Sequence, residues 1–195
     1  MTMTDLDPHT METPRLVNAR FMLSHPAHMI ALGFGAGLAP KAPGTVGTLW
    51  AWAGFLIAEH FFASQTLLWI VCVGAFLGCW ICGHVSEELG KKDFGGIVLD
   101  EIIAFWFILL FIMPASLWMQ AIAFILFRFF DAVKPGPIGY IDRYFKRVEN
   151  TGEPSTTLQI LWRGFGIMVD DLAAALSTLL IIALLQMIGS HLGWM

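Results

Sequence analysis

Five carboxylates lie at the ends of apolar segments of this 195-residue chain. Asp100 and Glu101 begin one segment, Asp131 ends the next, and Asp170 and Asp171 begin the last. Carboxylates at a membrane edge are costly unless they have partners. Mg²⁺ prefers oxygen ligands and commonly binds through one or two carboxylates together with a substrate phosphate. The pattern therefore predicts a divalent-metal site that faces a phosphorylated lipid.

The adjacent pairs Asp100-Glu101 and Asp170-Asp171 also have a purely structural interpretation. Acids in the first turn of a helix gain about 0.3–1 kcal/mol from the helix dipole. That gain explains one acid per helix better than two, because each pair follows three apolar residues and is drawn toward the hydrocarbon. Neighbouring helical side chains also point about 100° apart, so at least one acid of each pair should face other helices. We therefore favour a metal or proton site.

Three charged residues near the end of the fourth apolar segment are spaced to share one helical face. They are Arg128, Asp131 and Lys134, at i, i+3 and i+6, and Pro135 and Pro137 then end the helix. One interpretation is a self-neutralised cluster at the membrane interface. The other is that the basic groups bind phosphate while Asp131 helps to bind metal. The spacing alone leaves both interpretations open.

The segment 33–48 is rich in glycine, proline and small polar residues. It lacks the Gly-x4-Gly-Lys-Ser/Thr pattern of a nucleotide-binding P-loop. One interpretation is tight turning and close helix contact through small residues. The alternative is a backbone cradle for a lipid head group, with Thr45 or Thr48 capping the helix that follows.

The composition is typical of an integral membrane protein. The chain is 57% hydrophobic and 13% charged, whereas a soluble domain carries about 25% charged residues. The formal net charge is −4, so the chain lacks the basic footprint that nucleic-acid binding requires. We expect no nucleic-acid partner.

Hydropathy predicts an all-α integral membrane protein with about five transmembrane helices, since a span needs about 20 mostly apolar residues. The expected spans are 47–62, 67–84, 97–113, 117–133 and 167–188. The glycine-broken stretch 29–39 is too short to cross and should be re-entrant or interfacial.

Lysine and arginine alternate completely between the segments that connect these spans. By the positive-inside rule, the N-terminus and the acid-bearing helix ends therefore lie on the cytoplasmic side. We expect a cytoplasmic tail at 1–26, a membrane-embedded domain at 27–190, and a loop at 134–166 between the last two spans.

Four blocks of sequence together resemble the phosphatidylglycerophosphatase A family. They are residues 33–48, 97–101, 127–138 and 166–171, and they occur in the family's order. The combination is specific, whereas no single block would be. The resemblance implies a Mg²⁺-dependent lipid phosphatase of the bacterial inner membrane. Such an enzyme would convert phosphatidylglycerophosphate to phosphatidylglycerol and inorganic phosphate in phospholipid biosynthesis.

The resemblance, taken with the spacing arguments, gives a set of candidate site residues. The catalytic and metal-binding candidates are Asp100, Glu101, Asp131, Asp170 and Asp171, with Asp93 and Asp142 as further candidates for the metal. The candidates for substrate binding are Arg128, Lys134, Thr45 and Thr48. Five acids exceed the need of one Mg²⁺ ion, so two ions or a separate base are both open. This chain has Lys92 and Ala104 where the family often has His and Gly, which weakens the role of Asp93.

Two other functions use related features. A divalent-cation transporter would place acids in a helical bundle, but the outer halves of these helices carry almost none. A CDP-alcohol phosphotransferase is a metal-dependent lipid phosphotransferase that also uses membrane-edge aspartates, but its Asp-Gly-x2-Ala-Arg-type signature is absent. Both stay as alternatives to the phosphatase.

Overall fold

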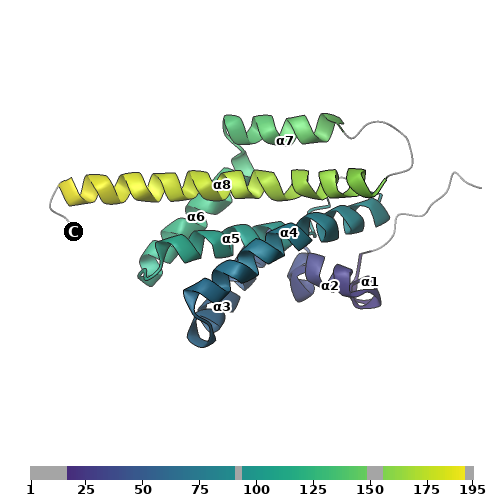
Figure 1. The fold of residues 1–195 in the computed structure, drawn as a ribbon, viewed down its shortest axis with the longest axis horizontal. Helices are drawn as coiled ribbons and strands as arrows, with labels where there is room; N and C mark the ends of the chain where they lie inside the picture. Colours follow the sequence, from purple (N-terminus) through teal and green to yellow (C-terminus); the bar gives the residue numbers. More distant parts are fainter. Residues whose placement is uncertain (1–16, 91–93, 149–155, 192–195) are drawn as a thin grey trace, which may run out of the picture.

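The computed structural model describes residues 17–90, 94–148 and 156–191, which form helices and no strand. The N-terminal part contains α1 (Ala19–Ser24), α2 (Pro26–Ala31) and the 3-10 segment η2 (Gly33–Leu38). The longer helices are α3 (Pro43–Phe61), α4 (Ser64–Glu88), α5 (Leu99–Ile112), α6 (Leu117–Val133), α7 (Pro137–Val148) and α8 (Thr157–His191). Figure 1 shows α8 running along the molecule, with α7 on one side and α3, α4 and α5 on the other. The prediction of an all-helical fold is confirmed for the described residues.

Among the described helices, α4 and α8 are long and apolar enough to cross a membrane. Only 28% of the most apolar window of α4 and 22% of that of α8 are buried inside the fold. A core helix of a soluble protein would be mostly buried, so these low values favour contact with lipid. The number of five spans stays a prediction.

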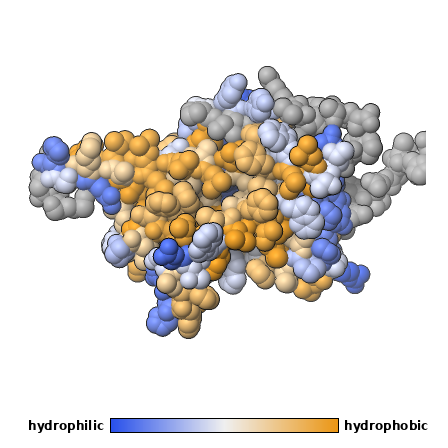
Figure 2. Space-filling model, in the orientation of Figure 1, coloured by the Kyte–Doolittle hydropathy of each residue, from blue (hydrophilic) through white to orange (hydrophobic). Residues whose placement is uncertain are grey.

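Large apolar side chains cover much of the outer surface. Trp69 is 67% exposed, Phe76 78% and Trp118 83%. Figure 2 shows a broad hydrophobic band across one face, with hydrophilic residues gathered toward its ends and lower edge. Contiguous apolar surface of this extent marks an interaction with a membrane or another protein.

Helices α4 and α8 cross closely because glycines remove the side chains between their backbones. A Cβ on Gly83 would overlap a carbonyl oxygen of α8, and one on Gly164 would overlap that of Cys79. Further along the pair, a Cβ on Gly78 would lie 3.2 Å from the sulfur of Met168. Late residues of α4 thus meet early residues of α8, so the two helices run antiparallel. The crossing fixes the position of α8 along its axis and with it the position of the acids that follow.

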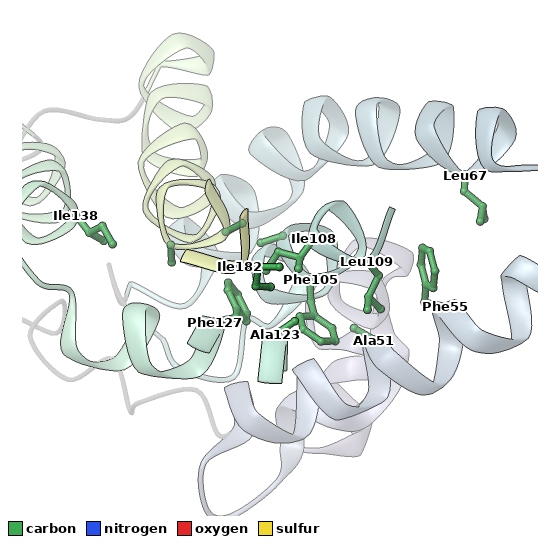
Figure 3. Packing of buried hydrophobic residues seen from close by; sticks show 13 residues of the cluster. Ala51, Phe55, Leu67, Phe105, Ile108, Leu109, Ala123, Phe127, Ile138 and Ile182 are labelled. Carbon is green, nitrogen blue, oxygen red and sulfur yellow. The ribbon is translucent and has the colours of Figure 1, made fainter. Parts of the chain in front are cut away.

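The apolar core lies between α3, α5, α6 and α8. Phe105 and Leu109 of α5 are fully buried against Ala51 of α3 and Ala123 and Phe127 of α6, as Figure 3 shows. The rings of Phe105 and Phe127 have centroids 5.8 Å apart. This packing fixes α5 against α6, and so sets the acid-bearing start of α5 relative to the end of α6.

The expectation of a loop at 134–166 is wrong for the described residues. Helix α7 occupies 137–148, and α8 begins at Thr157, well before the expected start of the last span. Phe145 of α7 packs on α8, where its ring centroid lies 5.2 Å from that of Trp162 and 5.7 Å from that of Phe165. A Cβ on Gly166 would lie 2.9 Å from the Cβ of Phe145. A short amphipathic helix has no long apolar run, so a search for spans misses it.

The glycine-broken stretch has the irregular backbone that the sequence predicts. Gly33 and Gly35 have positive φ angles of 53° and 110°, a region that glycine adopts without a steric penalty. Gly37 packs so closely that a Cβ would overlap the carbonyl oxygen of Gly96. The stretch therefore supports the turn that precedes α5. Residues 1–16 of the expected tail lie outside the described residues, whereas 19–24 form α1.

Helix α3 begins earlier than expected and is not capped by a threonine. Its first residue is Pro43, and its N-cap is Ala42, which makes no side-chain capping bond. Proline is favoured at this first position because the N–H that it lacks would have no helical partner there. Thr48 lies inside the helix, where its hydroxyl donates to the carbonyl of Gly44 at 2.8 Å. The expectation that Thr45 or Thr48 caps this helix is therefore wrong.

Candidate functional site

The start of α5 is held by the glycine-rich segment and by α3. Val98 is the N-cap of α5, and its N–H donates to the carbonyl of Ala31 at 2.9 Å. A Cβ on Gly33 would lie 2.8 Å from the Val98 side chain, and one on Gly47 would lie 2.7 Å from it. Only glycine allows this close approach, so the segment fixes the helix end that carries Asp100.

Three carboxylates from two helices meet at this helix end. Asp100 and Glu101 of α5 and Asp171 of α8 each offer an oxygen, and these oxygens all lie within 4.8 Å of one another. Asp100 is 9% exposed and Asp171 is 3% exposed. Ionised carboxylates this close together and this well buried are desolvated and repel one another. The arrangement therefore calls for a positive charge among them.

Each of these three carboxyl groups has a buried oxygen without a hydrogen-bond partner among the described residues. The atoms are Oδ1 of Asp100, Oε2 of Glu101 and Oδ2 of Asp171. Buried polar atoms are normally hydrogen-bonded, and an exception points to a water or an ion. A divalent cation with oxygen ligands would satisfy all three atoms. The residues present thus fit a metal such as Mg²⁺.

Arg128 of α6 contacts carboxylates of two helices and a hydroxyl group of a third. Its Nη1 lies 2.7 Å from Oδ2 of Asp131 and 3.8 Å from Oε1 of Glu101. The same Nη1 donates to the hydroxyl of Thr48 at 3.4 Å. Glu101 in turn meets Asp171 of α8 in the three-carboxylate group. Helices α3, α5, α6 and α8 therefore all contribute to one polar cluster.

Lys134 brings a second cation to the cluster. It is the C-cap of α6, has a left-handed backbone with φ 47°, and forms an ion pair with Asp170 of α8. Gly136 also has a positive φ, at 55°, and the chain then turns back into α7. A Cβ on Gly139 would lie 2.6 Å from the carbonyl oxygen of Lys134. The tight turn after α6 thus places the lysine beside the acid pair of α8.

Among the side chains that the structure describes, the carboxylates of the cluster outnumber its cations. Five acids and two basic groups leave a formal excess of three negative charges in this part of the chain. Arg128 forms ion pairs with Asp131 and Glu101, and Lys134 forms one with Asp170. Between the described residues, no ion pair joins a cation to Asp100 or Asp171. The unbalanced charge lies at the three-carboxylate group itself.

Gly44 is a site residue that sequence reasoning did not single out. A Cβ there would overlap Oε1 of Glu101 and lie 3.1 Å from Nη2 of Arg128. The first turn of α3 therefore closes directly over this ion pair, and only glycine leaves the room. The sequence signal for it is its place in the glycine-rich segment, where tight turning and a head-group cradle are both open and no particular residue stands out. Thr45, the next residue, is half-buried in the same turn.

The structure brings most of the candidate residues together. Those that join the cluster are Asp100, Glu101, Asp131, Asp170, Asp171, Arg128, Lys134 and Thr48. Asp93 lies outside the described residues, and the side chain of Asp142, in α7, does as well. The chemical role of each residue stays a prediction.

A family profile and two relatives of this chain carry the same name. A sequence profile described as phosphatidylglycerophosphatase A matches residues 29–151. The chain is 35% identical over 168 residues to a phosphatidylglycerophosphatase A of Haemophilus influenzae, covering 86% of this chain and 93% of the relative. It is 33% identical over 177 residues to a phosphatidylglycerophosphatase A of Escherichia coli, covering 90% and 91%.

A third relative bears a different name. It is a putative phosphatidylinositol-3-phosphatase of Bacteroides thetaiotaomicron, 30% identical over 161 residues, with 80% of this chain and 90% of the relative covered. No solved structure matches the chain. The profile covers more than half of the chain and the relatives cover most of it, and on these findings the chain belongs to the phosphatidylglycerophosphatase A family of enzymes.

Proposed function

We propose that this protein is a Mg²⁺-dependent lipid phosphatase that hydrolyses phosphatidylglycerophosphate to phosphatidylglycerol and inorganic phosphate. The observation that carries the proposal is the group of three carboxylates, each with an unsatisfied buried oxygen. Two cations, Arg128 and Lys134, lie beside it and suit a phosphate. The names of the Haemophilus and Escherichia relatives supply the substrate.

The proposal includes a membrane arrangement with five spans, in which the N-terminus and the site lie at the cytoplasmic face of the bacterial inner membrane. The distribution of lysine and arginine supports this orientation. The part of α8 from Asp171 to His191 is about 30 Å long at 1.5 Å per residue, close to the roughly 30 Å thickness of the hydrocarbon core. If His191 lies at one edge of the hydrocarbon, the acid pair lies at the other, where a lipid phosphate would be.

The reaction replaces the ester bond between phosphorus and the glycerol oxygen by a bond to a water oxygen. A bound Mg²⁺ would polarise the phosphoryl oxygens and make a coordinated water easier to ionise. Arg128 and Lys134 neutralise the phosphate and orient it by charge-assisted hydrogen bonds. A carboxylate of the cluster accepts the proton from the water, and a proton is returned to the departing glycerol oxygen.

Phosphate release from phosphatidylglycerophosphate in mixed detergent micelles tests the proposal. We expect release by the wild type with Mg²⁺, none with EDTA, and a large loss in Asp171→Asn. Glu59→Gln is the matched control, because Glu59 lies at the end of α3 opposite to Gly44, and it should keep full activity.

The same assay on other substrates defines the specificity. Phosphatidylinositol 3-phosphate is the relevant comparison because of the name of the Bacteroides relative. Preference for that lipid would support the phosphatase activity but change the assigned substrate. A folded wild type that releases phosphate from neither lipid would overturn the proposal and favour a transporter.

A further inference from the structure

Glycines inside the long helices are of two kinds. At the α4–α8 crossing, a Cβ on Gly83 or Gly164 would overlap backbone atoms of the other helix. On Gly54 of α3, a Cβ would instead lie 3.6 Å from Cζ2 of Trp106, and on Gly74 of α4 it would lie 3.4 Å from Cδ1 of Ile103. These are ordinary van der Waals separations, so close helix packing does not require glycine there. Since glycine weakens a helix relative to alanine, these two positions need another explanation.

Both of these glycines line an apolar groove. The groove has a volume of about 330 Å³ and lies between α3, α4 and α5, with residues of α2 and η2 also contributing. Its lining includes Ile30, Phe34, Trp50, Gly54, Gly74 and Trp106 and is almost entirely apolar. The volume is at the lower end of the roughly 300–1,000 Å³ range of small-molecule sites. Glycine at these two positions keeps the groove open.

Two helices that line the groove, α3 and α5, also contribute to the carboxylate cluster. On α5, Leu99 and Ile102 line the groove and flank the pair Asp100-Glu101 in the sequence. The lining continues to Trp106, which lies seven residues beyond Leu99, or about 10 Å further along the helix axis. On α3, Gly44 touches the cluster, and the groove begins at Trp50. Helices α3 and α5 thus both carry residues of the polar cluster near their first turns and line the apolar groove further along.

We propose that this groove binds an acyl chain of the phospholipid whose phosphate lies at the carboxylate cluster. The inference rests on the proposed function, because it takes its occupant from the lipid substrate. A chain seated along α5 would fix how far the head group reaches into the cluster. The enzyme would therefore recognise its substrate by the hydrocarbon as well as by the phosphate, and it would prefer long chains to short ones.

Filling the groove tests the proposal. Gly54→Leu and Gly74→Leu introduce side chains into it, and leucine favours helix more than glycine does, so folding should be kept. Val73→Leu is the matched control, since Val73 adjoins Gly74 on α4 but is 51% exposed and outside the lining. For phosphatidylglycerophosphate with two oleoyl chains, we expect the glycine variants to raise KM about tenfold, equivalent to fewer than two buried methylene groups. Activity on the dihexanoyl form should be unchanged, and the control should behave as the wild type with both.

Equal losses on both substrates, or no loss on either, would overturn the acyl-chain site. A second readout separates this outcome from failure of the proposed function. Phosphatidylglycerophosphate with a photoactivatable diazirine in one chain should label α3 or α5 of the wild type, and the label should fall in Gly74→Leu. Labelling without hydrolysis would overturn the proposed function but still support the groove as a site for an acyl chain. Equal labelling of wild type and variant would overturn the groove.

Discussion

Two groups of charged side chains at helix ends differ in how their charges are balanced. At the end of α4, Glu87 pairs with Arg163 of α8, and Glu88 lies 2.7 Å from Nε2 of His28 of α2. At the carboxylate cluster, five acids share Arg128 and Lys134. In the first group each acid has a basic partner on another helix, which is what fastening helices together requires. The surplus of acids in the second group serves no packing purpose and suits a cation from solution.

This difference has an energetic meaning. A partly exposed ion pair contributes about 0–1 kcal/mol to stability, and its loss is easily tolerated. Buried carboxylates that repel one another cost stability, and proteins keep such arrangements where function needs them. We therefore expect the cluster to lower the stability of the fold while it supports activity. The pairs at the end of α4 should contribute to stability alone. Four substitutions test that contrast.

The largest effect is expected for Asp100→Asn. It removes one of the three carboxylates that meet at the start of α5. Losing a metal ligand should lower kcat by at least about 100-fold, more than the 10–100-fold typical of partners in the outer shell of a metal site. Because one buried negative charge is removed, Tm without metal should stay or rise. Phosphate release with Mg²⁺ would measure kcat, and thermal unfolding in EDTA would measure Tm. A lower Tm with retained activity would contradict the expected difference between the two groups of charges.

A smaller but still large effect is expected for Gly44→Ala. The added methyl group would overlap Oε1 of Glu101 and lie 3.1 Å from Nη2 of Arg128, so it would displace this ion pair. A displacement of about 1 Å can cost about 100-fold in rate, so we expect a loss of 10- to 100-fold in kcat. Gly95→Ala is the control, since a Cβ there would meet nothing within 4 Å. Equal rates for the two alanine variants would show that the first turn of α3 does not position the site.

Arg128→Lys should act on binding more than on chemistry. Lysine keeps the charge, which Nη1 of Arg128 places near both Asp131 and Glu101, but it lacks the planar guanidinium fork that binds phosphate through two parallel hydrogen bonds. We expect KM for phosphatidylglycerophosphate to rise about tenfold, the equivalent of one lost charge-assisted hydrogen bond, with a smaller change in kcat. Steady-state kinetics at saturating Mg²⁺ would separate the two constants. An unchanged KM would remove Arg128 from the phosphate site and leave it as a partner of Asp131.

The smallest effect is expected for Glu87→Gln. Its pair with Arg163 is partly exposed, with 36% of the Glu87 side chain accessible. The free energy of unfolding should fall by no more than about 1 kcal/mol, and phosphate release should be unchanged. Denaturation in mild detergent and the standard assay would measure these quantities. A loss of activity comparable to that of Asp100→Asn would mean that the two groups of charges do not differ in role.

The sequence was most informative where spacing or burial constrains a residue directly. Carboxylates that interrupt apolar runs stand out because hydrocarbon excludes them, and Asp100, Asp131 and Asp171 do lie in one cluster. The helical character of the chain follows equally directly from its long apolar segments. The pairing of Arg128 with Asp131 follows from their i, i+3 spacing.

Contacts between distant segments could not be predicted in the same way. Nothing local marks Gly44 as the residue under Glu101, because the requirement for glycine comes from another helix. Hydropathy does not predict helix α7, because its apolar residues occupy one face and never form a long run. Hydropathy also predicts a later start for α8 than the structure has, since the early part of this helix packs closely on α4 at Gly164 and on α7 at Gly166.

Direct binding of a metal ion is the most decisive measurement of the central claim. Mn²⁺ accepts the same oxygen ligands as Mg²⁺ and is visible by electron paramagnetic resonance in detergent solution. The account predicts that the wild type and Glu87→Gln bind Mn²⁺ in competition with Mg²⁺, and that Asp100→Asn and Asp171→Asn lose this binding while remaining folded. Binding that persists in both aspartate variants would contradict a metal site at the three-carboxylate group.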